Sequence, residues 1–226
     1  EKREKGPMDL FTAAVLGIVE GISEFLPISS TGHLILASSF LGLRHTDFLK
    51  SFEIAIQVGA IASVVVLYWR SLLVDKNILA KVILAFIPTG IMGLTLYRII
   101  KQFLLGSAQV VLWSLFVGGI LLILFEICHR EKEDAVAEVG GISWRQALII
   151  GCFQAIAMIP GVSRSAATIV GGLLLGLKRK VIVEFSFLLA VPTMLAATAY
   201  DLLKSGSQFS LDQVQFLAVG FATSFV

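Results

Sequence analysis

The sequence predicts an all-α protein that crosses a lipid bilayer several times. Of its 226 residues, 57% are hydrophobic and only 15% are charged, and the mean hydropathy is +0.90. Soluble domains contain roughly 45–50% apolar and about 25% charged residues. The apolar segments are continuous and lack the alternation of a transmembrane β-strand. The sequence also has no basic patch. We therefore expect a bilayer, and no nucleic acid, among its partners.

The chain opens with two short apolar segments, 8–26 and 28–43, separated by Pro27. A proline ends or kinks a helix, and a spanning helix needs about 20 apolar residues, so each segment alone is marginal. We therefore expect a re-entrant helical hairpin whose tip is PISS (27–30). Residues 1–7 (EKREKGP) are expected to precede the native start at Met8.

Three longer apolar segments follow, at 48–69, 78–97 and 103–127, and each is expected to span the bilayer. The first ends in Tyr68 and Trp69, aromatic residues that favour the membrane interface. After the third comes the one clearly polar stretch of the chain, HREKEDAVAEVGG, which indicates a solvated loop.

The second half of the sequence repeats the order of the first. Residues 144–159 are stopped by Pro160, a short helix then runs to Gly176, a span is expected at 181–203, and another begins at 211. A shift of 134 positions aligns the two halves weakly but places Gly17 on Gly151 and Ser29 on Ser163. Because three spans separate the two hairpins, the second should enter from the opposite face, which predicts an inverted-topology repeat.

We therefore expect one membrane domain (1–226), divided into repeat one (8–128), a connecting loop (129–143) and an incomplete repeat two (144–226). Repeat two holds fewer spans, so the natural protein is expected to continue by roughly 40 residues, enough to complete one span and add another. The distribution of lysine and arginine weakly favours an orientation in which the first hairpin enters from the outer face.

Both predicted tips offer the same chemistry, because each is a helix N-terminus lined with hydroxyl groups. Free N–H groups and the positive end of the helix dipole attract anions. At the second tip, Arg164 can hold phosphate oxygens with a fork of donors, and Gly161 lets the backbone approach closely. The hydroxyls expected to bind phosphate are Ser29, Thr31, Ser163, Ser165 and Thr168, and Ser30 is the candidate nucleophile.

Two carboxylates precede the first tip. Glu20 and Glu24 are four residues apart and share one helix face, and ionisable groups at membrane depth usually serve chemistry or transport. Carboxylates beside a bound anion repel it unless a divalent cation lies between them, as Mg²⁺ or Ca²⁺ does when bound by carboxylates and substrate phosphates. His33 shares the face of the tip serines and could act as acid or base. Gln57, in the next span, is expected to support this site, although helix–helix contacts are the alternative role for it.

Several of these residues carry a family resemblance. The segments EGISEFLPISSTGH (20–33) and PGVSRSAAT (160–168) resemble the two signature motifs of the undecaprenyl pyrophosphate phosphatase family of the bacitracin-resistance type. The segments FEIAIQVGA (52–60) and FSFLLAVP (185–192) are also similar to that family, and the resemblance covers essentially the whole chain from Met8.

The resemblance implies removal of the terminal phosphate from a C55 polyprenyl pyrophosphate in the bacterial inner membrane, in a multi-pass enzyme whose site opens to the outer face. It implies a divalent cation, with the metal-binding pair on Glu20 and Glu24. The catalytic serine, histidine and arginine fall on Ser30, His33 and Arg164. Whether Ser30 is the nucleophile or His33 activates a water stays open, as does a homodimer.

A second class of function also fits the inverted hairpins. A flippase or another transporter of an anionic headgroup would use the same architecture. The pair Ser30 and His33 favours the hydrolase, because binding alone needs no nucleophile and base together.

Overall fold

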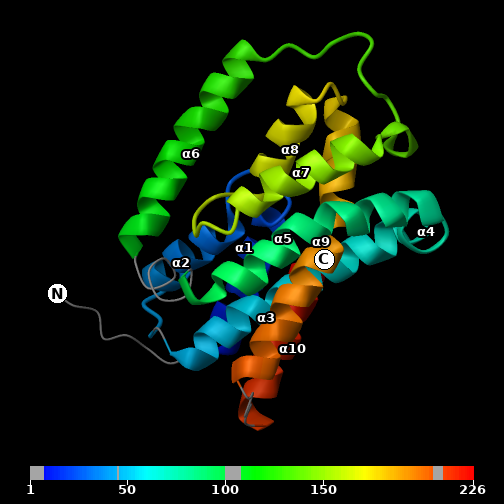
Figure 1. Cartoon of the computed structure of the whole chain (residues 1–226). Coiled ribbons are helices and arrows are strands. Elements are labelled where there is room, and N and C mark those ends of the chain that lie inside the picture. The colour runs from blue at the N-terminus through cyan, green and yellow to red at the C-terminus, as the bar shows by residue number, and fades with distance from the viewer. Residues whose placement is uncertain (1–7, 45, 100–107, 206–210) are drawn as a thin grey trace.

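The computed structural model describes residues 8–44, 46–99, 108–205 and 211–226, and these residues are almost entirely helical (Figure 1). The predicted leader, residues 1–7, and the start of the third predicted span, at 103–107, lie outside the described residues. The helices are α1 (Leu10–Ser23), α2 (Ser30–Phe40), α3 (Asp47–Leu67), α4 (Trp69–Leu73), α5 (Lys76–Ile99), α6 (Ala108–Cys128), the 3₁₀ turn η2 (Val139–Gly141), α7 (Trp144–Ile156), α8 (Arg164–Leu174), α9 (Arg179–Ser205) and α10 (Leu211–Phe225).

Four helices within the described residues are long and apolar enough to cross a membrane, which confirms a multi-pass helical membrane protein. Their apolar windows are Phe48–Leu67, Lys76–Thr95, Gln109–Cys128 and Arg179–Tyr200. They correspond to the four spans predicted at 48–69, 78–97, 103–127 and 181–203. Pro88 and Pro192 both lie inside their helices, α5 and α9, without ending them.

The two predicted breaks are also present. Helices α1 and α2 contain 14 and 11 residues, and α7 and α8 contain 13 and 11, all shorter than the roughly 20 residues of a spanning helix. The breaks between them fall around Pro27 and around Pro160, as expected. Each pair of short helices is in contact along the chain, α1 with α2 and α7 with α8.

The helix starts at the two breaks differ. Ser163 caps α8 in the usual way, because its backbone is extended and its Oγ accepts the N–H of Ala166 at 3.2 Å. Ser29 precedes α2 with φ of 65° and ψ of 96° and makes no side-chain cap. Ser29 therefore does not cap α2 with its hydroxyl. Its backbone is not extended, and an extended backbone is what normally aims a capping hydroxyl into the helix.

Helix α1, which carries Glu20 and has Glu24 as its C-cap, is held against α10 and α3 by small residues. A Cβ added at Gly17 would come within 2.5 Å of the carbonyl oxygen of Gly220, so the backbones of α1 and α10 touch. Ser224 of α10 donates its hydroxyl to the carbonyl of Ile56 on α3 at 2.7 Å. Close approach through small residues is the usual way in which helices pack inside a membrane.

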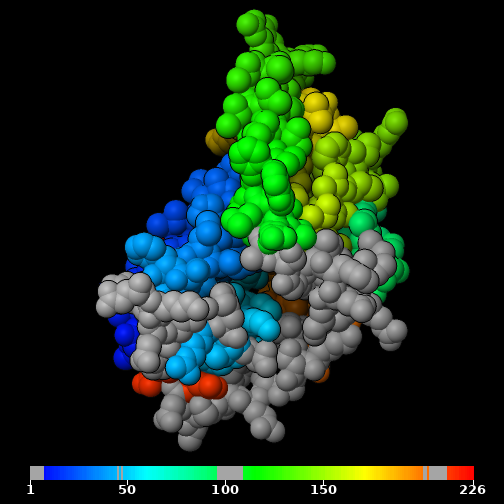
Figure 2. Space-filling view, turned by 90° about the vertical axis from the view of Figure 1, so that its left-hand side faces the viewer, coloured from blue at the N-terminus to red at the C-terminus, as the bar shows by residue number. Residues whose placement is uncertain are grey.

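Helix α6 lies apart from this packed body. Only 6% of its apolar window is buried, compared with 50% of the α9 window. Figure 2 shows α6 in green along the outside, between the blue N-terminal helices and the yellow-green second hairpin. Its first turns touch both hairpins, because a Cβ at Gly32 would meet the Leu115 side chain at 2.9 Å and one at Gly161 would meet the Val111 carbonyl at 2.6 Å.

The contact between α1 and α10 yields a first prediction. Gly17→Leu should lower the thermal stability of the detergent-solubilised protein, by about 1–3 kcal/mol or more, because the added side chain meets backbone that cannot move aside. Thermal unfolding monitored by circular dichroism measures the change. Gly118→Leu in α6 is the matched control, since a Cβ there has no neighbour within 4 Å. Equal effects at the two glycines would contradict this account of the packing.

Candidate active site

The structure brings the two hairpin tips into direct contact. Ser165, in the first turn of α8, donates its hydroxyl to the carbonyl of Leu26 at 2.7 Å. Arg164, beside it, forms an ion pair with Glu24, with 3.0 Å between Nη2 and Oε1. The two charged side chains are 3% and 9% exposed, although 140 residues separate them in sequence. Two groups of residues that the sequence predicted as one site therefore lie together.

Glu24 lies at the centre of this contact. While its Oε1 accepts from Arg164, its Oε2 accepts the hydroxyl of Ser30 at 2.5 Å. Hydrogen bonds to an ionised carboxylate are shorter and stronger than neutral ones. A carboxylate in this position can remove the serine proton, and Ser30 is thereby polarised as a nucleophile. The acidic or basic side chain that contacts Ser30 is thus Glu24, whereas the sequence had offered His33 as the base either of Ser30 or of a water.

His33 is oriented by the tip backbone. Its Nδ1 lies 2.9 Å from the carbonyl oxygen of Ser29. A carbonyl can only accept, so Nδ1 carries the proton and Nε2 of the neutral ring keeps a free lone pair. The unusual φ of Ser29 sets the direction of that carbonyl. The arrangement leaves His33 able to take a proton at Nε2.

Glu20 is the least compensated group at the site. It is fully buried, and neither carboxylate oxygen has a hydrogen-bond partner among the described residues. Its charged neighbours are the carboxylates of Glu24 and Glu53 and the guanidinium of Arg164. Burying a carboxylate without a partner is costly, so this position calls for a positive group that the protein itself does not supply.

A divalent cation fits this requirement. The part of the chain that the structure describes contains no group of three or more His, Cys, Asp or Glu side chains able to hold a metal. Glu20 and Glu24 lie one turn apart, so together they could provide two carboxylates, with the remaining ligands coming from substrate phosphates and water, as is common for Mg²⁺. The unpaired oxygens of Glu20 are the observation that supports such a site.

Arg164 offers the complementary opening for an anion. Its Nη1 and Nη2 are occupied, but its buried Nε has no partner among the described residues. A phosphate oxygen would satisfy this donor, because guanidinium N–H groups bind phosphate with matched geometry. The buried groups that lack partners at this site are thus the two carboxylate oxygens of Glu20, which are acceptors, and the Nε of Arg164, which is a donor.

The remaining predicted residues fall into two groups. Thr31 is exposed in the first turn of α2, and Gly161, with φ of 92°, forms the second tip. Gln57 is half-buried on α3, and no hydrogen bond joins it to either tip within the described chain. The hydroxyls of Ser163, Ser165 and Thr168 are used inside the protein, since Ser163 lies 3.1 Å from Ser165 and Thr168 donates to backbone carbonyls.

Sequence reasoning missed Ser186 of α9. Its carbonyl accepts from Arg164 Nη1 at 3.0 Å, and its hydroxyl lies 2.6 Å from that of Thr168. The segment FSFLLAVP had been noted for its resemblance to the family, but a single serine in an apolar span gives no further signal. Glu53, four residues before Gln57 on α3, is a further charged neighbour of Glu20.

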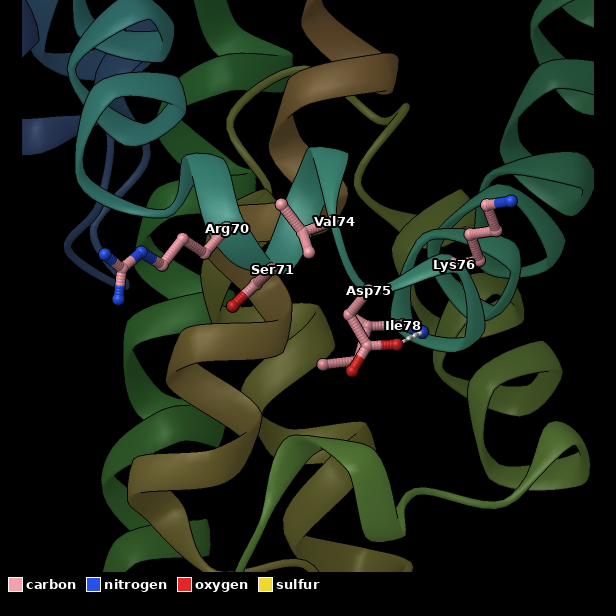
Figure 3. A pocket seen from close by; sticks show the side chains of 6 residues that line it. All are labelled: Arg70, Ser71, Val74, Asp75, Lys76 and Ile78. Atoms are coloured by element: carbon pink, nitrogen blue, oxygen red, sulfur yellow. Dashed lines mark hydrogen bonds between the residues drawn. The ribbon is translucent and has the colours of Figure 1, made fainter.

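A surface pocket elsewhere does not compete with this site. It lies around α4 and the start of α5, where Arg70 and Lys76 point away from each other and Asp75 caps α5 by accepting the N–H of Ile78 at 3.1 Å (Figure 3). Its polar groups do not converge on a common point, as a binding site requires. Its lining is Arg70, Ser71, Val74, Asp75, Lys76 and Ile78.

Comparison with known proteins gives a consistent result. The family model described as bacitracin resistance protein BacA matches residues 13–226. A protein of Aquifex aeolicus named undecaprenyl-diphosphatase is 58% identical over 97% of this chain and 85% of its own length. Proteins with the same name from a Sulfurihydrogenibium species and from Wolinella succinogenes are each 51% identical over 97% of this chain, and the matches cover 86% and 85% of them.

The isolation of Glu20 yields a second prediction. In a buffer free of divalent cations, Glu20→Gln should raise the free energy of unfolding by an amount on the order of 1–3 kcal/mol, because it removes a buried carboxylate that has no partner. The unfolding temperature should rise accordingly. Thermal unfolding in detergent measures the shift. Glu126→Gln is the control, since that carboxylate is half-exposed and pairs with Arg179, and its loss should change stability by less than about 1 kcal/mol. A destabilised Glu20→Gln protein would show that Glu20 already has a partner.

Proposed function

The chain belongs to the family of the bacitracin resistance protein BacA, and from this membership and its site geometry we propose that it hydrolyses undecaprenyl pyrophosphate to undecaprenyl phosphate and inorganic phosphate. It is a membrane phosphatase whose relatives at 45–58% identity are named undecaprenyl-diphosphatase. The observation that carries the proposal is the Glu24 carboxylate, which contacts a serine nucleophile and an arginine at once.

The reaction is a phosphoryl transfer from a phosphoanhydride. Ser30 Oγ attacks the terminal phosphorus while Glu24 takes its proton. An Oγ–P bond forms, and the P–O bond to the polyprenyl phosphate breaks. Arg164, which contacts the same carboxylate as Ser30, stabilises the negative charge that develops on the phosphoryl oxygens. The leaving group is undecaprenyl phosphate, already an anion at neutral pH, and it departs without needing a proton.

His33 serves the second half of the reaction. Its Nε2 lone pair takes a proton from a water molecule, which attacks the phosphorus bound to Ser30 and releases inorganic phosphate. Ser30 Oγ recovers its proton from Glu24. When bound by Glu20 and Glu24, a divalent cation would neutralise the pyrophosphate charge next to the carboxylates.

The flippase alternative has less support. The relatives of this chain carry the name of a hydrolase. A serine that donates to a buried carboxylate at 2.5 Å is also an arrangement that transport does not require.

We also propose how the chain lies in the bilayer. The short pairs α1–α2 and α7–α8 are re-entrant hairpins that enter from opposite faces, and together they form an inverted repeat. The lengths of the four helices and the odd number of candidate spans between the pairs (α3, α5 and α6) support this arrangement. The protein then lies in the bacterial inner membrane with the site open to the outer face.

Phosphate release tests the activity directly. The purified protein in detergent should release inorganic phosphate from undecaprenyl pyrophosphate, and Ser30→Ala should lower kcat by about 10²-fold or more, because the nucleophile is lost. Ser39→Ala, an exposed serine at the far end of α2, is the control and should retain the wild-type rate. Full turnover by Ser30→Ala would transfer the nucleophile role to a water activated by His33.

Removal of divalent cations tests the role of the carboxylates. After chelation the rate should fall to near background, and added Mg²⁺ should restore it. Mg²⁺ should also raise the unfolding temperature of the wild type but not that of Glu20→Gln, since a ligand that binds only the folded protein stabilises it. An undiminished rate after chelation would remove the cation from the proposal and leave the roles of Ser30 and Arg164 intact.

A further inference from the structure

Arg164 is held from two sides, and only one of them belongs to the catalytic groups. Its Nη2 faces Glu24 on the first tip, and its Nη1 donates to the carbonyl of Ser186 on α9 at 3.0 Å. A long arginine side chain loses considerable rotamer freedom when it is fixed in one position. The α9 contact therefore determines which way the guanidinium, and its free Nε, is directed.

Behind this contact lies a pair of buried hydroxyls. Thr168 Oγ1 is 3.1 Å from the carbonyl of Arg164 and 3.0 Å from that of Ser165, so Thr168 uses its single proton on these carbonyls. A bond of 2.6 Å joins the hydroxyls of Thr168 and Ser186, and Ser186 is its donor whenever Thr168 donates to a carbonyl. The pair thus joins the backbone of Arg164 to α9 at the level where the side chain of Arg164 also meets α9.

These hydroxyls are placed to orient the arginine rather than to bind substrate. Thr168 and Ser186 are each 0% exposed, and their hydroxyls bond to each other inside the protein. Arg164 is the first residue of α8, where a helix end is otherwise free to shift. The bonds from Thr168 and Ser186 fix both the backbone and the head group of this one residue.

We propose that Thr168 and Ser186 are positioning residues that hold Arg164 against Glu24 and aim its free Nε at the terminal phosphate of the substrate. The inference rests on the proposed phosphatase activity. It predicts that these residues affect the rate of chemistry more than substrate binding, because a misplaced charge loses most of its effect in the transition state.

The test compares variants with and without the hydroxyls. Thr168→Val keeps the shape and removes the hydroxyl, Ser186→Ala removes its partner, and Thr168→Ser keeps the hydroxyl. For undecaprenyl pyrophosphate, Thr168→Val and Ser186→Ala should each lower kcat about tenfold or more with a smaller change in KM. Thr168→Ser should recover most of the rate, and the double variant should be no worse than either single one, because the pair acts as a unit.

Controls separate positioning from loss of fold. Each rate is divided by the amount of folded protein, which thermal unfolding and gel filtration in detergent determine. Ser63→Ala removes a hydroxyl that bonds only within α3, to the Ala60 carbonyl at 2.7 Å, and should retain the wild-type rate. Wild-type kcat in Thr168→Val, an equal loss in Thr168→Ser, or multiplicative effects in the double variant would each overturn the inference.

A second readout keeps the inference testable apart from the activity. Inorganic pyrophosphate with Mg²⁺ should raise the unfolding temperature of the wild type and of Thr168→Ser, and should do so less in Thr168→Val, because Arg164 is then held less firmly. If the wild type released no phosphate, the proposed function would fail while this comparison still decided the role of the hydroxyl pair. Equal shifts in all three proteins would overturn it.

Discussion

The buried ion pair between Arg164 and Glu24 is the interaction on which the site depends. It joins two hairpin tips through residues that are 140 positions apart in sequence, with 3.0 Å between Arg164 Nη2 and Glu24 Oε1. A buried ion pair is rarely the most stable solution for a protein core, because two charges must be removed from water. Its presence here makes sense because both partners keep capacity for a further ligand. Glu24 also accepts from Ser30, and Arg164 has an unpaired Nε.

The charges around this pair do not balance within the described protein. Glu20 has the carboxylates of Glu24 and Glu53 as neighbours, whereas the guanidinium of Arg164 is the positive group beside Glu20 and Glu24 in a region of low dielectric. The site therefore favours ligands that bring positive and negative charge together, and a metal–pyrophosphate complex has both. The unbalanced charges lower the stability of the ligand-free protein, and binding of such a ligand restores it. This trade-off is common at functional sites.

Much of this arrangement could be predicted from the sequence. The spans follow from long apolar segments, and both breaks follow from Pro27 and Pro160, because local chemistry alone decides them. The residues at the tips were identified as one site from their residue types. What could not be predicted is which atoms meet. The partner of Ser30 was expected to be His33, yet the turn at Ser29 directs Ser30 to Glu24 and leaves the His33 ring on a backbone carbonyl.

The same limit applies to Ser29, Ser186 and Thr168. A serine before a helix normally caps it, and only the three-dimensional course of the tip reveals its positive φ. The role of Ser186 arises from contact between α8 and α9, and no spacing in the sequence encodes that contact. Helix propensities and apolar periods describe single elements, whereas these bonds depend on how elements meet.

The distance along the chain between the two tips also constrains how the protein is made. When the ribosome has delivered only the first hairpin and the helices up to α6, Glu20 and Glu24 have neither Arg164 nor the second tip beside them. Two uncompensated carboxylates at that depth are unfavourable in lipid. The first hairpin is therefore destabilised in its final position until the second has been synthesised, and the nascent chain acquires its active centre only after that point.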